Sequence, residues 1–468
     1  MCHVSSSSQA NAAALADTIV DCAARACDRI EHRCPLSDPR PPAIDAESTS
    51  ASPGSAAPPL AWTPYQKRLF VFLSVATFFE GYDFLALTQI LPNLRRDMGL
   101  TPGEGGALVG FTNIGMVLAF LLVRKADVWG RRPVLNLTIV GYTLASLATS
   151  VMPNAIGFGL CQLLARFFLI AEWAVAMIYA AEEFPAARRG FVIGLIQACA
   201  SLGSITCAGI VPLLLKTPWG WRSVFVVGAV PLVIMAVARR GLRETSRFER
   251  MRAGREASYT QASLLRIFTR DSAHIRTVLY LATAWGLTYI CTFNIHAFFK
   301  EYAVAERGMT DAQVGGTVTV AALVSMPLIF LVGRLIDRAG RRMGAVVIFG
   351  TTAVATVLTY QLHSRLGVTV GLTLAIFGVS AVLPVLNAYT TELFPTDLRS
   401  DGFAWANMLM GRTTQVLSPW ALGVLAGSLG WSTPLSATAI FPLLVLALIL
   451  WRFPETAGRE LEETAALH

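Results

Sequence analysis

Five charged residues lie inside long apolar stretches of this chain, where a charge is costly unless it is paired or meets water. They are Glu80, Asp83, Arg166, Glu172 and Arg412. Glu80 and Asp83 are three residues apart and therefore share one face of a helix. A carboxylate in such a place can pair with a guanidinium, and the fork of an arginine matches a carboxylate or phosphate ligand. The sequence therefore predicts ion pairing and anion binding within apolar helices.

The elements that position these charges are membrane spans. The chain has 468 residues, of which 54% are hydrophobic and 15% charged, whereas about a quarter of the residues of a soluble domain are charged. Continuous apolar runs of about 20 residues, long enough to cross a bilayer as helices, recur along it. They predict an all-α membrane protein with twelve transmembrane helices: 69–92, 104–124, 134–152, 156–181, 190–215, 222–240, 277–300, 311–333, 344–361, 367–391, 401–428 and 433–452.

The register of these helices predicts one ion pair. Asp83 lies about two residues beyond the centre of its helix and Arg166 about two before the centre of its own, in a helix that runs the other way. The two side chains are therefore level within one turn and can pair across a cavity. Such a pair can separate during the function of the protein; the alternative is a permanent ion pair with a purely structural role. For Arg412, the alternative to anion binding is an arginine that caps carbonyls or extends toward the membrane surface.

Five uncharged polar residues in the predicted helices are candidates for a substrate-binding surface. They are Gln197, Asn294, His296, Asn387 and Asn407. Polar side chains in membrane helices also make helix–helix contacts. For each of the five residues, a helix–helix contact is therefore the alternative to substrate binding.

Two segments of the chain repeat each other at one offset. ADVWGRR around Asp127 returns as IDRAGRR around Asp337, and YAAEEFP returns as YTTELFP; the differences 337−127 and 392−182 are both 210. One offset across separate motifs indicates two halves built on one plan. A fold of two pseudo-symmetric six-helix bundles follows.

The repeated motifs place charges at the turns and ends of predicted helices on one side of the membrane. Glycine permits the tight turn, and the carboxylates can accept charge-assisted hydrogen bonds from the arginines. We expect these residues to form a cytoplasmic gate that closes and opens as the halves move. The alternative is that they only flank the helices and set topology. The predicted gate consists of Asp127, Gly130, Arg131, Glu182, Arg188, Asp337, Gly340, Arg341, Glu392 and Arg399.

The net charge of +8 is concentrated on the same side as these motifs, which predicts that both termini lie in the cytoplasm. Membrane topology thus explains the basic charge without nucleic acid. The predicted organisation is a disordered cytoplasmic tail over 1–64, a bundle over 65–241, a cytoplasmic linker over 242–275, a second bundle over 276–453 and a tail over 454–468. Cys2, Cys22, Cys27 and Cys34 in the first tail fit no standard zinc spacing, so no metal is expected there.

The motifs resemble those of the major facilitator superfamily. The segment from Gly333 to Arg342 matches the signature loop of that superfamily, and the copy from Val123 to Arg132 keeps Asp127, Gly130, Arg131 and Arg132. RETSRFE and PETAGREL are similar to segments of the sugar-porter and related organic-anion branches. FEGYD is similar to the first-helix motif of the sugar porters and of the aromatic-acid:proton symporters.

This resemblance implies a secondary active transporter with proton-coupling residues Asp83, Glu80, Arg166 and Glu172. Protonation of Asp83 would release Arg166 and change the energy of the movement between the two halves. We expect proton-coupled symport of a small organic anion, an aromatic or aliphatic carboxylate, at the plasma (inner) membrane, with alternating access. The alternatives are a sugar or polyol symporter, an exporter, or a nutrient sensor with the same fold. We expect no enzyme activity and no cofactor, and a protein that works as a monomer in the lipid bilayer.

Overall fold

The computed structural model describes residues 62–184, 186–229, 243–245, 249, 272–394 and 399–456. The chain divides into two compact units, 1–71 and 72–468, which are described separately. In the first unit only residues 62–71 are described, and helix α2 begins there at Pro64. Residues 1–61 of the predicted 1–64 tail, with its four cysteines, lie outside the described residues, as do most of the 242–275 linker and most of the 454–468 tail.

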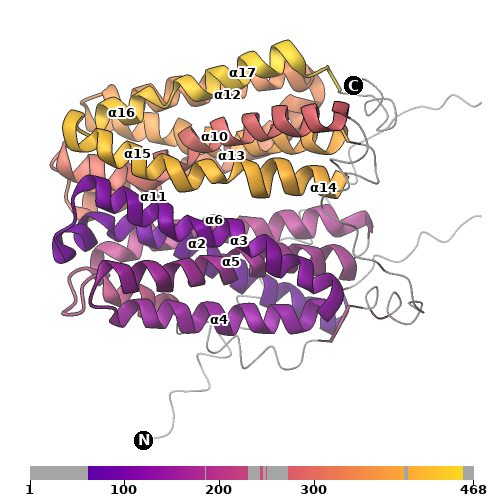
Figure 1. The fold of residues 1–468 in the computed structure, drawn as a ribbon, viewed down its shortest axis with the longest axis horizontal. Helices are drawn as coiled ribbons and strands as arrows, with labels where there is room; N and C mark the ends of the chain where they lie inside the picture. Colours follow the sequence, from indigo (N-terminus) through magenta and orange to yellow (C-terminus); the bar gives the residue numbers. More distant parts are fainter. Residues whose placement is uncertain are drawn as a thin grey trace, which may run out of the picture. The chain divides into compact units, whose positions relative to one another are not determined.

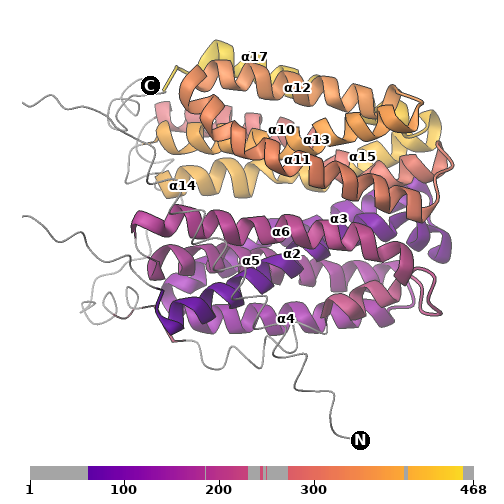
Figure 2. The same cartoon turned by 180° about the vertical axis from the view of Figure 1, so that it is seen from behind.

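The described helices of the second unit form two groups in Figures 1 and 2, one indigo to magenta and one red to yellow. We call the first group the N-terminal half. It contains the part of α2 (Pro64–Met98) from residue 72 onward, α3 (Pro102–Trp129), α4 (Arg131–Val151), α5 (Ala155–Glu183) and α6 (Ala186–Leu214). The second group is the C-terminal half. It contains α10 (Ser272–Ala305), α11 (Asp311–Ala339), α12 (Arg341–Gln361), α13 (Arg365–Glu392), α14 (Arg399–Phe403), η2 (Ala404–Gly411), α15 (Thr413–Leu429), α16 (Ser432–Ala437) and α17 (Ile440–Arg452).

The predicted apolar runs correspond closely to these helices. Eleven of the twelve coincide with described helices, and the sixth is described only in its first turns, over 222–229. Nine helices in the described residues are long and apolar enough to cross a membrane. The described part of the chain contains no strand, so the prediction of an all-α membrane protein is confirmed.

The internal repeat extends to the residues that begin helices. Thr101 and Thr310 each form a capping box, in which the threonine side chain and a residue three positions later bind each other's backbone N–H groups. Asn154 and Ser364, which are 210 residues apart, cap α5 and α13. The turns at Gly130 and Gly340 have φ values of 101° and 87°, which favour glycine. Matching caps therefore fix matching helix boundaries in the two halves.

The halves meet through α3 against α15 and α6 against α11. The first contact is close because it involves glycine: a Cβ built on Gly106 would lie 2.2 Å from the Pro419 carbonyl oxygen. Arg95 lies in the last turn of α2, close to the first residues of α3 and the last residues of α15. We call this end of the helices the Arg95 end, and the opposite end, where α4 and α12 begin, the Arg131 end.

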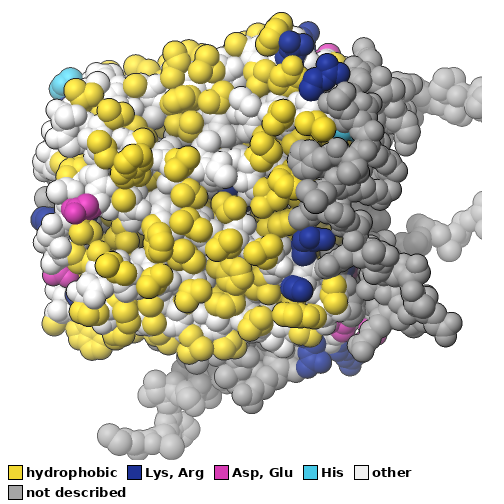
Figure 3. Space-filling view, viewed as in Figure 1, with side chains coloured by type: hydrophobic (Ala, Val, Ile, Leu, Met, Phe, Trp, Pro, Cys, Tyr) yellow, Lys and Arg dark blue, Asp and Glu magenta, His cyan; other side chains and the backbone are white. Residues whose placement is uncertain are grey.

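Side chains on the outside of the helices are mainly apolar. On the face shown in Figure 3, hydrophobic side chains cover the helices between their ends, and most Lys and Arg side chains gather at one end. Exposed large residues such as Leu121, Leu144 and Trp451 are 58%, 63% and 70% accessible. Contiguous exposed apolar surface of this kind is expected where lipid contacts a protein.

Candidate functional site

A cavity of about 370 Å³ lies between the two halves. Its lining comes from α2, α3, α5 and α6 on one side and from α10, α11, α13 and α15 on the other. Three of the predicted site residues line it, namely Glu80, His296 and Arg412. Most of the remaining wall is apolar or aromatic, so these three side chains dominate its electrostatics.

Arg412 reaches the cavity from an irregular part of its helix. The eight residues before it, Ala404–Gly411, form the π-helical segment η2, and the Arg412 N–H donates to the Asn407 carbonyl at 3.1 Å, five residues back. Such π segments alter the direction of the side chains that follow and often occur at functional sites. Arg412 Nε is buried and has no hydrogen-bond partner within the described residues. The guanidinium also contacts the Tyr289 side chain and interacts with the charge of Glu80, and all three groups line the cavity.

Glu80 and His296 supply the other titratable groups of the wall. Glu80 Oε2 is buried and, among the residues described, has no hydrogen-bond partner. His296 Nδ1 lies 3.3 Å from the Thr292 carbonyl oxygen, one turn back on α10. That contact favours a proton on Nδ1, which leaves Nε2 as the acceptor of a neutral ring. The cavity thus combines one arginine, one carboxylate and one imidazole.

Asp83 and Arg166 are more deeply placed, with only 4% and 3% of their surfaces exposed. Their charges interact, but the two side chains, both described in the structure, do not form a direct ion pair. Arg166 instead lies over the Phe84 ring, 5.8 Å from its centroid, and Nη1 lies 3.7 Å from the Met116 sulfur. Phe84 and Met116 both line the cavity. Arg166 therefore contacts the cavity wall from behind.

Glu172 faces α4, where its Oε2 accepts a hydrogen bond of 2.5 Å from the Thr138 hydroxyl. It is 6% exposed and lies close enough to Glu80 for the two carboxylates to interact. The four residues predicted for proton coupling therefore occupy one region of the N-terminal half. Only Glu80 among them lines the cavity.

The remaining predicted lining residues contact neighbouring helices or support the wall. Asn294 donates to the Ser418 hydroxyl at 2.8 Å. Asn407 Oδ1 accepts from the hydroxyl of Tyr289 at 2.9 Å, and Gln197 Oε1 accepts from Trp173 Nε1 at 2.9 Å. Asn387 is exposed and does not line the cavity.

The aromatic wall emerges only in three dimensions. Phe84, Trp173, Tyr289 and Phe293 line the cavity from three helices, and no motif distinguishes them in the sequence. Trp173 and Tyr289 are the two rings held by Gln197 and Asn407. The amide side chains thus orient the rings and do not form the wall themselves, a role that residue type alone does not reveal.

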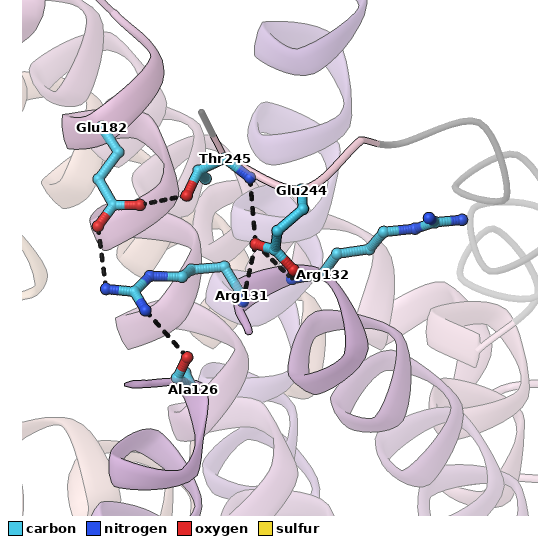
Figure 4. A network of polar contacts seen from close by, with 6 residues as sticks. All are labelled: Ala126, Arg131, Arg132, Glu182, Glu244 and Thr245. Atoms are coloured by element: carbon cyan, nitrogen blue, oxygen red, sulfur yellow. Dashed lines mark hydrogen bonds and ion pairs between the residues drawn. The ribbon is translucent and has the colours of Figure 1, made fainter. Parts of the chain in front are cut away.

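At the Arg131 end, the repeated charges join three helix ends within the N-terminal half (Figure 4). Arg131 Nη2 pairs with Glu182 Oε1 at 3.0 Å, while Nη1 donates to the Ala126 carbonyl. Glu182 Oε2 accepts from the Thr245 hydroxyl at 2.6 Å. Glu244 accepts the backbone N–H groups of Arg131 and Arg132, at 2.9 and 3.2 Å.

The C-terminal half repeats this network. Arg341 pairs with Glu392 at 3.2 Å, and Thr456 donates to Glu392 at 2.5 Å. Glu455 accepts the backbone N–H groups of Arg341 and Arg342 at 2.7 and 2.9 Å. In each half a carboxylate distant in sequence caps a helix whose own N-cap is a glycine without a side-chain cap. Sequence reasoning missed these caps, although Glu244 and Glu455 stand 211 residues apart in the similar triplets RET and PET.

The contacts of this network described in the structure stay within one half. Four other residues of the predicted gate could make contacts between the halves at this end. Their side chains lie outside the described part of the chain: Asp127, Arg188, Asp337 and Arg399. The described contacts fasten each half internally, so each can move as one body. The gating role of the network stays a prediction.

The symmetric halves, the cavity between them and the repeated turns agree with one family. The family model described as Major Facilitator Superfamily matches residues 73–305 and 281–466. The chain belongs to the Major Facilitator Superfamily. It is a membrane transporter and not an enzyme.

Known members of the superfamily resemble this transporter over most of its length. It is 27% identical to a probable 4-methylmuconolactone transporter of Cupriavidus pinatubonensis, with 86% of this chain and 94% of that protein covered. It is 26% identical to a gallate transporter of Pseudomonas putida, covering 83% and 90%. Its structure resembles the inward open xylose transporter XylE from E. coli, with a TM-score of 0.69, 14% identity and coverage of 86% and 99%. At that identity the last comparison supports the fold alone.

The described residues of the transporter contain no group of three His, Cys, Asp or Glu side chains placed to hold a metal ion.

Proposed function

We propose that this transporter carries a small organic anion, an aromatic or aliphatic carboxylate, and that Arg412 binds its carboxylate. The observation that supports this most directly is the position of Arg412 on the wall of an otherwise largely apolar cavity, with Nε buried and unpartnered among the described residues. A guanidinium can bind a carboxylate through two parallel hydrogen bonds. A neutral sugar has no negative charge to offer this guanidinium.

The aromatic wall favours a flat hydrophobic body attached to that carboxylate. Tyr289 and Phe293 on α10 face the cavity together with Trp173 on α5, so rings from both halves can contact one substrate. Offset or edge-on contacts between aromatic rings add about 0.5–1.5 kcal/mol beyond burial. The gallate transporter among the relatives carries an aromatic carboxylate, which supports the same class here.

We also propose that transport is coupled to protons through Asp83 and Glu80. Asp83 and Glu80 are one helical turn apart; Glu80 is on the cavity wall, and the charge of Asp83 interacts with that of Arg166. Because Arg166 contacts Phe84 and Met116 on the wall, a substrate that moves those side chains also moves the charge beside Asp83. A proton on either carboxylate would offset the negative charge of the substrate. This supports symport, in which the anion and the proton travel together.

We place the Arg131 end in the cytoplasm and the protein in the plasma membrane. The excess of Lys and Arg at one end of the helices in Figure 3 supports this orientation through the positive-inside rule. The cytoplasmic gate predicted from the repeated motifs would then lie at the inner mouth.

A ligand screen tests the substrate assignment. Purified protein is heated with aromatic and aliphatic carboxylates, their methyl esters or amides, and sugars; a ligand at about 100 times its Kd stabilises the folded state by about 2.7 kcal/mol. We expect a carboxylate to raise the melting temperature and its ester not to do so. Stabilisation by a sugar or polyol, without any carboxylate effect, would favour the sugar-symporter alternative.

The Arg412→Gln variant then locates the binding site. Loss of a hydrogen bond to a charged group costs about 1.5–3 kcal/mol, so the affinity for the carboxylate should fall by roughly 10- to 100-fold. Arg222→Gln is the matched control, because Arg222 lies at the Arg95 end, away from the cavity. Equal loss of affinity in both variants would argue against recognition by Arg412.

A further inference from the structure

Two consecutive charged residues are buried near the end of α10. Lys300 is 2% exposed and Glu301 3% exposed, at the Arg95 end and outside the cavity lining described above. Charges are rarely buried to this extent unless they are paired. Neither residue has a charged counterpart in the N-terminal half, since the positions 210 residues earlier are Ile90 and Leu91. They are therefore not part of the repeated scaffold.

Both side chains reach across to α2 in the other half. Glu301 Oε2 pairs with Arg95 Nη1 at 2.7 Å, and Lys300 Nζ donates to the Gln89 carbonyl at 2.5 Å. Lys300 also pairs with Asp311, the first residue of α11, at 2.6 Å. Among the ion pairs described in this structure, Arg95–Glu301 is the one that joins the two halves.

The surroundings show that this end is closed. Apolar residues of both halves, including Leu94 and Phe298, form one buried cluster beside the charges. Helices α3 and α15 touch backbone to backbone at Gly106 and Pro419. A second cavity of about 420 Å³, lined by Arg95 and Glu301 among others, lies beside the ion pair. If the halves separated here, water could reach both charges from that space.

We propose that Arg95, Lys300 and Glu301 form a charged gate that holds the Arg95 end closed and separates when that end opens. A buried ion pair stabilises little overall, because its attraction offsets the desolvation of its members. Loss of one member is nevertheless strongly unfavourable, since the other then remains buried alone. Such a contact permits reversible opening when both charges become hydrated together. The gate acts independently of the substrate carried and of the membrane face that this end meets.

A native cysteine reports the opening. Cys207 is fully buried on α6 in the same apolar cluster. Transporter in lipid nanodiscs is treated with a water-soluble maleimide, and modification of the Cys207 peptide is followed by mass spectrometry. Arg95→Gln and Glu301→Gln should each speed the modification by about tenfold or more, which corresponds to about 1.4 kcal/mol in the opening equilibrium.

The double variant gives the sharper result. Arg95→Gln/Glu301→Gln removes both charges of the pair, so neither is left buried alone. The rate of Cys207 modification should therefore return to within about threefold of that of the unmodified protein, a clear departure from additivity of the single effects. Asp97→Asn is the matched control. It breaks an ion pair of 3.1 Å with Arg222 at the same end but within the N-terminal half, and should leave the rate unchanged.

Three labelling results at Cys207 would by themselves overturn the gate. The single variants could label at the unmodified rate, the Asp97→Asn control could accelerate labelling as much as they do, or the double variant could equal the product of the single effects. Cys291 on α10 is fully buried in the same cluster but contacts Thr356 on α12, so its labelling reports loss of packing inside the C-terminal half. Equal acceleration at Cys207 and Cys291 would show general loosening and would also contradict the gate.

Discussion

The helix caps supplied by Glu244 and Glu455 give a quantitative prediction. Glu455 accepts two backbone N–H groups at the start of α12, at 2.7 and 2.9 Å, where Gly340 provides no side-chain cap. Hydrogen bonds to a charged group are worth about 1.5–3 kcal/mol. Glu455→Gln keeps one acceptor oxygen and turns the other into an amide NH2 that cannot accept, so about one such bond, roughly 2 kcal/mol, is lost. The total of about 2 kcal/mol matches the upper range for an anion at a partly buried helix N-terminus.

This loss should appear in thermal unfolding. For a unit of 150–250 residues, about 1 kcal/mol changes the melting temperature by roughly 2–4 °C, so Glu455→Gln should lower it by roughly 4–8 °C. The assay is unfolding of the purified protein in detergent, followed by intrinsic tryptophan fluorescence. Glu244→Gln removes the equivalent cap of α4 and should act in the same direction.

The matched control is Glu249→Gln, which removes one negative charge from an exposed side chain close to Glu244. It should leave the melting temperature within about 1 °C, as expected for a surface substitution. If Glu455→Gln behaves like this control, or if Glu249→Gln destabilises as much, the carboxylate caps do not fasten the halves and the reasoning is refuted.

Three further predictions concern transport. Asp83→Asn should abolish proton-driven accumulation in proteoliposomes while sparing substrate exchange; full uphill uptake would exclude its coupling role. Gly106→Val should prevent closure at the Arg95 end, because its Cβ would lie 2.2 Å from the Pro419 carbonyl oxygen, and should stop net uptake; normal uptake would show that this contact is not required. Gln197→Leu removes the hydrogen bond that orients Trp173 and should weaken aromatic substrates several-fold more than aliphatic ones in competition assays, and an equal effect would argue against ring contact.

The sequence predicted the membrane helices well because hydropathy depends on composition over about 20 residues. It underestimated their ends: 69–92 was predicted where α2 extends over Pro64–Met98. The additional turns are polar, with Arg95 and Arg96 in the last one, and a hydropathy window excludes them. Pro92 lies within α2 without ending it. The predicted helix 401–428 is divided by the π segment Ala404–Gly411, which has no signature in a pattern based on 3.6 residues per turn.

Charged residues of the candidate site could be selected from the sequence because charges are rare in apolar helices, whereas the uncharged polar residues could not be selected reliably. A charge in an apolar helix stands out, so Glu80, Arg166 and Arg412 could be selected from the sequence alone. Asn294 and Asn407 were selected for polarity, yet their amides serve neighbouring side chains. Whether an amide faces a cavity or a helix depends on rotation about the helix axis by a few tens of degrees. Hydropathy does not determine that angle.

Symmetry explains why the two kinds of charge behave differently. Among the repeated charges whose side chains are described, Arg131 pairs with Glu182 and Arg341 with Glu392, each within its own half. Contacts that recur in both halves make both rigid in the same way. Charges without a counterpart in the other half distinguish the two halves. They include Glu80, Asp83, Arg166, Glu172 and Arg412 around the cavity, and Arg95, Lys300 and Glu301 at the gate.

This division has a consequence for coupling. A substrate anion at the proposed Arg412 site would change the charge balance of the cavity, and the proposed gate pair Arg95–Glu301 would stabilise one closed end. In the cavity and in the gate alike, α2 supplies charged residues on one side and the C-terminal half supplies them on the other. Helix α2 carries Asp83 and Glu80 about three and four turns before Arg95, on one continuous helix. A shift of α2 against the C-terminal half would therefore act on the cavity and the gate together. Continuity of that helix, and not a chain of side-chain contacts, is the simplest physical link between the two sites.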